Sequence, residues 1–184
     1  MKKVILTAIV AVASLSASAQ VWIGGDLGFG FQKRGQDGAK TESTVKIAPE
    51  IGYMINDNFG VYADINFTTE SNKYEEEEYA EKAATSFGFD VAARYIFAKT
   101  GIASFFVDGG FGIDFYNNNG GSVFDIKVQP GVKFDASEKV SIVAKLGGIR
   151  FASANKKAQE NFPKTAFGLN VANTDLSLGV YYNF

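Results

Sequence analysis

The last nine residues of the chain, LSLGVYYNF (residues 176–184), alternate between apolar positions and small or polar positions. Leu176, Leu178, Val180, Tyr182 and Phe184 form one apolar row. Alternation with a period of two is the geometry of a β-strand, because successive side chains point to opposite faces. Chain ends are usually polar and frayed, so a strand that ends on an aromatic residue is unusual. An ordinary buried strand that happens to come last would also fit this stretch, and only the rest of the chain distinguishes between the two interpretations.

The other end of the chain predicts export. The sequence opens with the cationic stretch MKK, continues with an apolar run interrupted by Thr7, and then offers small residues at 16–19. This pattern predicts a cleavable signal peptide over residues 1–19, which is too short for a transmembrane helix. Residues 20–184 are then expected to form one domain. They contain no cysteine for a disulfide or a lipid anchor and no long apolar run, which leaves a secreted β protein or a membrane β-barrel.

Alternating apolar residues divide the rest of the chain into eight segments. These begin near Val21, Val45, Phe59, Phe87, Ala103, Phe124, Val140 and Thr165. The pair Gly147-Gly148 is expected to shift the phase of the seventh segment. In the eighth, the apolar row changes from odd to even numbers, which predicts a β-bulge near Ala172–Asp175. A hairpin turn at Asn173–Asp175 would instead give nine strands, but single-chain bacterial barrels have even numbers, so we predict eight.

The connections between these segments alternate in length. Three of them are short and rich in Asn, Asp, Lys and Gly, at residues 56–58, 98–101 and 135–139. The others are longer and polar, at residues 32–44, 70–86, 116–122 and 152–164. Short turns on one side and long loops on the other are typical of outer-membrane barrels.

The two faces of the segments differ in charge. One face is rich in Phe, Val and Ile, whereas the other carries charged residues: Asp26, Lys46, Glu50, Asp64, Asp90, Arg94, Asp108, Asp114, Asp125, Lys127, Lys133 and Lys145. A soluble sandwich or lipocalin would turn the charged face to water, and a membrane barrel would turn it inward.

Aromatic residues at both ends of the segments favour the membrane barrel. One group lies beside the short turns, at Tyr53, Phe59, Tyr95, Phe97, Phe134, Tyr182 and Phe184. A second group lies beside the long loops, at Phe31, Phe67, Phe87, Phe115, Phe124 and Phe167. Two such girdles mark the two membrane interfaces. We therefore predict an all-β fold, an eight-stranded antiparallel up-and-down transmembrane β-barrel.

At three places the sequence resembles a known family: Leu176–Phe184, Pro49–Tyr53 and Ala93–Tyr95. Over residues 20–184 the chain is similar to small bacterial outer-membrane barrels of the OmpA/OmpX-like, porin-family "outer membrane protein β-barrel domain" type. The resemblance implies a location in the outer membrane of a Gram-negative bacterium. It also implies contact with outer-membrane lipid, and recognition of the C-terminal strand by the barrel-assembly machinery.

The inward charges set the expected function. The interior of an eight-stranded barrel is just wide enough for its own side chains, and unpaired buried charges are costly. We therefore expect seven acids and five bases to form an ion-pair lattice, with inward glycines leaving room for the long Lys, Arg and Glu side chains. The prediction is a structural or surface-interaction barrel, whose loops at 32–44, 70–86 and 152–164 meet the cell exterior. The alternative is a narrow pore or minor transport role, gated near Arg94.

Other functions have less support. The chain contains no histidine, the base on which catalytic triads and many general-base mechanisms rely, so we expect no enzyme and no catalytic, cofactor-binding or metal-binding residues. The glutamate run at Glu75–Glu78 could gather calcium, but such runs are more often simply solvated. The formal net charge of −2 argues against nucleic acid. We expect a monomer whose extracellular loop partner is unknown.

Overall fold

The computed structural model describes residues 20–33, 41–71, 84–117, 120–160, 163–170 and 176–184. The predicted signal peptide at 1–19, the predicted bulge near Ala172–Asp175 and the glutamate run at Glu75–Glu78 lie outside these ranges.

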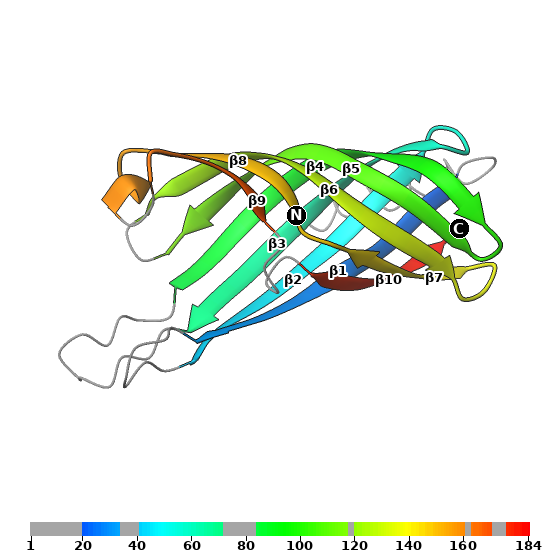
Figure 1. Cartoon of the computed structure of the whole chain (residues 1–184), viewed down its shortest axis with the longest axis horizontal. Coiled ribbons are helices and arrows are strands. Elements are labelled where there is room, and N and C mark those ends of the chain that lie inside the picture. Colours follow the sequence, from blue (N-terminus) through cyan, green and yellow to red (C-terminus); the bar gives the residue numbers. More distant parts are fainter. Residues whose placement is uncertain (1–19, 34–40, 72–83, 118–119, 161–162, 171–175) are drawn as a thin grey trace, which may run out of the picture.

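The described residues form a barrel of long antiparallel strands (Figure 1). The strands are β1 (Gln20–Lys33), β2 (Thr41–Met54), β3 (Phe59–Ser71), β4 (Ala84–Thr100), β5 (Ala103–Tyr116), β6 (Ser122–Asp135), β7 (Val140–Lys145), β8 (Gly148–Ala154), β9 (Thr165–Asn170) and β10 (Ser177–Asn183). A short 3-10 helix, η3 (Ala158–Glu160), lies in the β8–β9 connection. No helix among the described residues is long and apolar enough to cross a bilayer.

Strand pairing closes the sheet into a ring. The order is β5-β4-β3-β2-β1-β10-β7-β6-β8-β9, and an additional pairing joins β5 to β6. Both β7 and β8 pair with β6, so they are two parts of one wall strand. β10 pairs with β7 and β9 pairs with β8, so β9 and β10 are likewise two parts of one wall strand. The described strands therefore occupy eight positions in the wall, and the prediction of a closed eight-stranded antiparallel barrel is confirmed.

The phase shift predicted at Gly147-Gly148 is present. Opposite β6, Gly131 pairs with Lys145 but Val128 pairs with Ile149, so the β7–β8 strand carries one extra residue between the two pairs. This is the geometry of a β-bulge. As a result the side chain of Lys145 faces inward and Ile149 faces outward, with the parity reversed between them.

The inward and outward faces are those predicted. All twelve predicted inward charges are buried or half-buried. The opposite face is apolar and exposed, for example at Ile51, Phe89, Val91 and Ile126, whose exposed fractions lie between 41% and 50%. A monomer in water rarely exposes so continuous an apolar surface, whereas hydrocarbon accommodates it.

The aromatic girdles also have the predicted positions. Tyr95, Phe97, Phe134, Tyr182 and Phe184 are exposed at the short-turn end of the barrel, where the C-terminus lies (Figure 1). Near the long connections, the exposed aromatic residues are Phe67, Phe115, Phe124 and Phe167. The side chain of Phe31 is outside the described part of the chain.

The short turns are stabilised by local hydrogen bonds, and one of them is shorter than predicted. Asn56 Oδ1 accepts bonds from the backbone N–H groups of Asn58 and Phe59, both at 2.9 Å. The turn expected at residues 98–101 is reduced to Gly101 and its neighbour, because residues 98–100 continue β4. Gly101 has φ of +53°, a conformation that glycine adopts without steric cost, and this permits the tight reversal.

Candidate functional site

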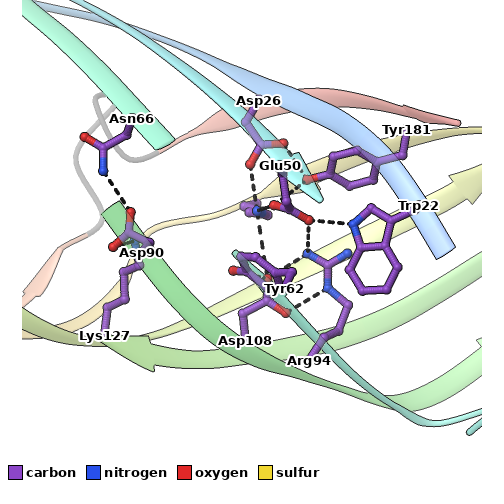
Figure 2. A network of polar contacts seen from close by, with 11 residues as sticks. Trp22, Asp26, Glu50, Tyr62, Asn66, Asp90, Arg94, Asp108, Lys127 and Tyr181 are labelled. Atoms are coloured by element: carbon purple, nitrogen blue, oxygen red, sulfur yellow. Dashed lines mark hydrogen bonds and ion pairs between the residues drawn. The ribbon is translucent and has the colours of Figure 1, made fainter. Parts of the chain in front are cut away.

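The interior of the barrel near the short turns is centred on Arg94, which β4 directs inward. Its Nε and Nη2 atoms each donate to a different oxygen of Asp108 on β5, both at 2.8 Å (Figure 2). Arg94 Nη2 also lies 3.9 Å from Glu50 Oε1 on β2. A bidentate pair of this kind is among the stronger hydrogen-bonded ion pairs in proteins, and it fixes the guanidinium in the middle of the lumen.

Aromatic rings surround this guanidinium. Arg94 Cζ lies 4.0 Å from the centroid of Phe106, 5.2 Å from Tyr62, 5.5 Å from Trp22 and 5.8 Å from Tyr181. Cation–π attraction operates over these distances. We call this group the Arg94 layer; it consists of Trp22, Glu50, Tyr62, Arg94, Phe106, Asp108, Lys145 and Tyr181.

Glu50 joins the layer to the strands that close the barrel. Its carboxylate accepts hydrogen bonds from Trp22 Nε1 at 2.8 Å and from Lys145 Nζ at 2.7 Å. The Tyr181 hydroxyl donates to Glu50 at 3.0 Å and to Asp26 at 2.7 Å (Figure 2). Lys145 Nζ also lies 2.7 Å from Asp26. The buried charges of the layer are thus paired and hydrogen-bonded, as buried charges must be.

Three inward glycines make room for aromatic rings. A Cβ atom added to Gly24 would meet the Tyr181 ring, one added to Gly52 would meet Trp22, and one added to Gly131 would meet Phe106. The sequence predicts that these glycines accommodate long Lys, Arg and Glu side chains. These three instead accommodate rings of the Arg94 layer, whereas an added Cβ on Gly28 would meet Lys46 and one on Gly112 would meet Asp90.

A second charged cluster lies nearer the long connections. Asp90 on β4 forms an ion pair with Lys127 Nζ at 2.9 Å and accepts a hydrogen bond from the Asn66 side-chain amide at 2.9 Å. Arg150 on β8 bridges Asp125 at 2.6 Å and Asp114 at 3.4 Å. Arg150 was not among the predicted inward residues. The signal was present, since the shift at Gly147-Gly148 turns the even-numbered residues of β8 inward.

A cavity of about 420 Å³ lies in this part of the lumen. It reaches from Tyr62 and Lys145 of the Arg94 layer to Thr44, Ser86 and Tyr116, beside the long connections. The ion-pair lattice predicted from the sequence is therefore two separate clusters, with open space between side chains in the outer one. Lys133 belongs to neither, because its ammonium pairs with Asp135 at 2.8 Å beside a short turn.

The described residues contain no group of three or more His, Cys, Asp or Glu side chains arranged to hold a metal ion. The expectation of no catalytic, cofactor-binding or metal-binding residues remains a prediction.

Comparisons with known proteins agree with the geometry. The family model of the outer membrane protein β-barrel domain matches residues 4–184. Among solved structures, Neisserial surface protein A (NspA) is similar with a TM-score of 0.53 and 15% identity, covering 90% of this chain and 97% of that chain. This likeness shows the fold.

Two further structures have lower scores. Ail, the attachment invasion locus protein of Yersinia pestis, gives a TM-score of 0.45 at 16% identity, covering 90% of this chain and 97% of its own. A major outer membrane protein from Thermus thermophilus gives 0.40 at 11% identity, covering 91% of this chain and 100% of its own. No curated protein matches the sequence.

Proposed function

Because the chain belongs to the outer membrane protein β-barrel domain family and lies in the outer membrane of a Gram-negative bacterium, we propose that it is a structural or surface-interaction barrel. In this proposal its lumen is closed by its own side chains. The long connections meet the cell exterior, the apolar face contacts outer-membrane lipid, and the barrel acts as a monomer without nucleic acid.

The Arg94 layer is the observation that carries the proposal. Phe106 has no exposed surface, Tyr181 is 1% exposed and Arg94 is 3% exposed. Val143 on β7 is also fully buried in the same cluster. A hydrated ion needs continuous water along its path, and side chains this deeply buried leave no room for it. Sixteen or more strands are needed for the wide aqueous channel of a porin.

The described part of the β8–β9 connection supports a role at the surface. Asn155 donates from its side-chain amide to Ser122 Oγ at 2.9 Å and accepts from the Ala158 N–H at 2.8 Å at the start of η3. Ala158 is fully buried against Val123 and Ala154. A loop folded in this way presents a fixed surface, which lowers the entropy cost of binding a partner.

Conductance measurements test the closed lumen. The refolded full chain in planar bilayers should give no steady conductance, because the Arg94 layer fills the lumen. Phe106→Ala should introduce measurable open events by removing the ring at the centre of the layer. Phe105→Ala is the matched control, since this neighbouring ring is 39% exposed on the outer face. A steady conductance of the unaltered chain that changes in an Arg94 variant would favour a narrow pore instead.

We also infer that the barrel is not an enzyme. The chain contains no histidine, so general-base catalysis by an imidazole is excluded. Six buried or half-buried carboxylates of the described residues are engaged with Arg or Lys side chains: Asp26, Glu50, Asp90, Asp108, Asp114 and Asp125.

A further inference from the structure

The outer faces of β8 and β9 change in character toward the long connection that joins these two strands. Side chains that lie opposite each other in the register form three cross-strand pairs on this face, and we call the six residues the β8–β9 face. The pairs are Ile149 with Leu169, Phe151 with Phe167, and Ser153 with Thr165. The face therefore passes from aliphatic to aromatic to hydroxyl side chains, and none of the six is acidic.

The apolar part of this face is unusually exposed. Phe167 is 77% exposed and Leu169 is 71% exposed, the largest fractions among the large apolar side chains that the structure describes. Among the described strands β9 pairs with β8 alone, so its side chains have a neighbouring strand on one side only. This arrangement leaves room beside them for a second apolar group, such as an acyl chain.

Basic side chains continue the face beyond the hydroxyl pair. The described part of the connection carries three exposed lysines, since Lys156 and Lys157 follow β8 and Lys164 precedes β9. The Ala154 N–H donates to the Lys164 carbonyl at 3.0 Å, so Lys164 lies beside Ala154, and Lys156 is two residues further along the chain. Positive charge thus gathers next to the hydroxyl pair, at the end of the barrel opposite the C-terminus (Figure 1).

Hydrogen bonds hold the backbone that carries these lysines. The Asn155 N–H donates to the Ser122 carbonyl at 3.0 Å, and the Gln159 side-chain amide donates to the Ala154 carbonyl at 3.0 Å. A backbone that is already ordered lowers the entropy cost of binding. The lysines are therefore presented from a fixed support.

The spacing between the aromatic pair and the lysines matches the headgroup layer of a bilayer. Phe167 belongs to the aromatic girdle, and Lys164 comes three positions before it. This separation is about 10 Å along an extended chain, or about 8 Å along the membrane normal for a strand tilted by about 40°. The headgroup layer outside the hydrocarbon core is about 5–8 Å thick. The long stem of a lysine lets its ammonium group reach lipid phosphates at this level.

The order of these side chains selects the chemical class of the partner. Clustered lysines beside a membrane attract anionic headgroups, and an ammonium group is a common ligand of phosphate. A soluble phosphate compound would contact the lysines and leave the apolar pairs uncovered. A zwitterionic lipid carries its own cation, which offsets the attraction. An anionic lipid with a terminal phosphate uses the whole face, with its phosphate on the lysines and an acyl chain on Phe167 and Leu169.

We propose that the β8–β9 face, together with Lys156 and Lys164, binds an anionic lipid whose headgroup ends in a phosphate monoester. The hydroxyls of Ser153 and Thr165 lie between the two parts and can donate to the ester oxygens of the lipid. The site deepens the proposed function and rests on it, because it assumes that the apolar face contacts lipid. Binding measured in detergent does not depend on whether the lumen conducts or on which end of the barrel faces the cell exterior. Failure of the site and failure of the closed surface barrel are therefore distinguishable.

Native mass spectrometry of the refolded full chain in detergent micelles tests the proposal, with phosphatidic acid as the probe. One lipid should bind, and phosphatidylcholine with the same acyl chains should bind about tenfold more weakly. The double variant Lys156→Gln/Lys164→Gln should lose about tenfold in affinity for phosphatidic acid or more, because two cationic contacts with the phosphate are lost. Lys99→Gln/Lys139→Gln is the matched control. It makes the same change in charge at two exposed lysines beside the short turns and should bind as the unaltered chain does.

Two further measurements separate a lipid site from a soluble phosphate site. Phe167→Ser should weaken the binding of phosphatidic acid, whereas Phe97→Ser, at a side chain 58% exposed near the short turns, should not. Glycerol 3-phosphate has the headgroup without acyl chains and should not displace the lipid at equal concentration.

Five results would each overturn the proposal. They are equal binding of the two lipids, unchanged affinity of Lys156→Gln/Lys164→Gln, an equal loss in the lysine control, unchanged affinity of Phe167→Ser, and displacement by glycerol 3-phosphate. If the double variant fails to fold, as judged by its gel migration before and after boiling, the Phe167→Ser and phosphatidylcholine comparisons decide.

Discussion

At the scale of the residue, removing one charged side chain from the lumen is expected to lower the stability of the barrel. The Arg94–Asp108 pair is almost fully buried, with side-chain exposures of 4% and 3%. A buried ion pair adds little net stability, because desolvation offsets the attraction, but removing one partner leaves a charge that nothing neutralises. The Tyr62 hydroxyl also donates to Asp108 at 2.9 Å, so two buried groups depend on this carboxylate.

Asp108→Asn is therefore expected to lower the free energy of unfolding by on the order of 3 kcal/mol. Urea unfolding in detergent, followed by gel migration, measures the change. Lys133→Met provides the control, since Lys133 and Asp135 pair with side-chain exposures of 25% and 41%, and exposed pairs contribute less than about 1 kcal/mol. Equal losses in the two variants would contradict the account of the Arg94 layer.

Gly52→Ala tests the fit between glycines and rings. The added Cβ would overlap the Trp22 ring, so the ring has to move, and overpacking of this kind costs about 1–3 kcal/mol. Trp22 is the one tryptophan of the chain, and its fluorescence should shift in the variant. Gly109→Ala is the control, because an added Cβ there meets no heavy atom within 4 Å. It should be neutral or slightly stabilising.

At the scale of the element, each strand separates two environments by alternation. On β4, Asp90 and Arg94 face the lumen, whereas Val91 is 47% exposed on the outer face. The side chains of one strand thus meet hydrocarbon and a charged interior in turn. A single-residue change of register would exchange the two sets, which is why the register is strongly specified.

Val91→Arg should lower folding stability in bilayers by about 2–4 kcal/mol, the cost of an arginine on the lipid face at the midplane. Ile102→Arg, in the short turn where Ile102 is 68% exposed, should cost less than about 1 kcal/mol, because the penalty falls near the interface. Equilibrium unfolding in lipid vesicles measures both. A harmless Val91→Arg would show that the apolar face does not contact lipid.

The two ends of the strands should face different compartments. Since the chain contains no cysteine, a single introduced cysteine can be labelled without background. A membrane-impermeant maleimide added to intact cells should label Lys156→Cys, in the long β8–β9 connection, but not Ser137→Cys, in a short turn. The reverse pattern would show that the barrel has the opposite orientation.

At the scale of the whole molecule, closure depends on the pairing of the first strand with the last. β1 pairs with β10 over Trp22–Gly28 and Ser177–Asn183, and the Phe184 N–H donates to the Val21 carbonyl at 2.9 Å. Closure leaves the wall without a free edge there, which a bilayer requires because it offers no water to unpaired backbone groups.

Phe184→Ser should reduce the amount of protein in the outer membrane more than it reduces stability in detergent. The reason is the proposed recognition of the C-terminal strand by the barrel-assembly machinery. Phe97→Ser is a matched control, since Phe97 is 58% exposed and Phe184 is 59% exposed at the same end of the barrel. Quantitative blotting of outer-membrane fractions compares them. Equal reduction in both variants would remove the special role of the terminal residue.

The sequence by itself determined the strands, their faces and the closed fold. Alternation is a local property, because the pleat sends each side chain to the face opposite its neighbour. The side on which Asp64 or Arg94 lies can therefore be read without knowing any partner. The shift at Gly147-Gly148 was readable for the same reason, and with it the inward position of Arg150.

Only the tertiary structure decided which inward side chains meet. Alternation gives the face of a residue but not its neighbours across the lumen, which depend on the register and tilt of all strands together. In the sequence, Trp22, Tyr62 and Tyr181 are inward residues of three separate strands. Their rings surround the Arg94 guanidinium because the barrel brings β1, β3 and β10 together. Likewise Asp64 is an ordinary inward acid in the sequence. Its position between Glu50 and Asp90 follows from the pairing of three strands.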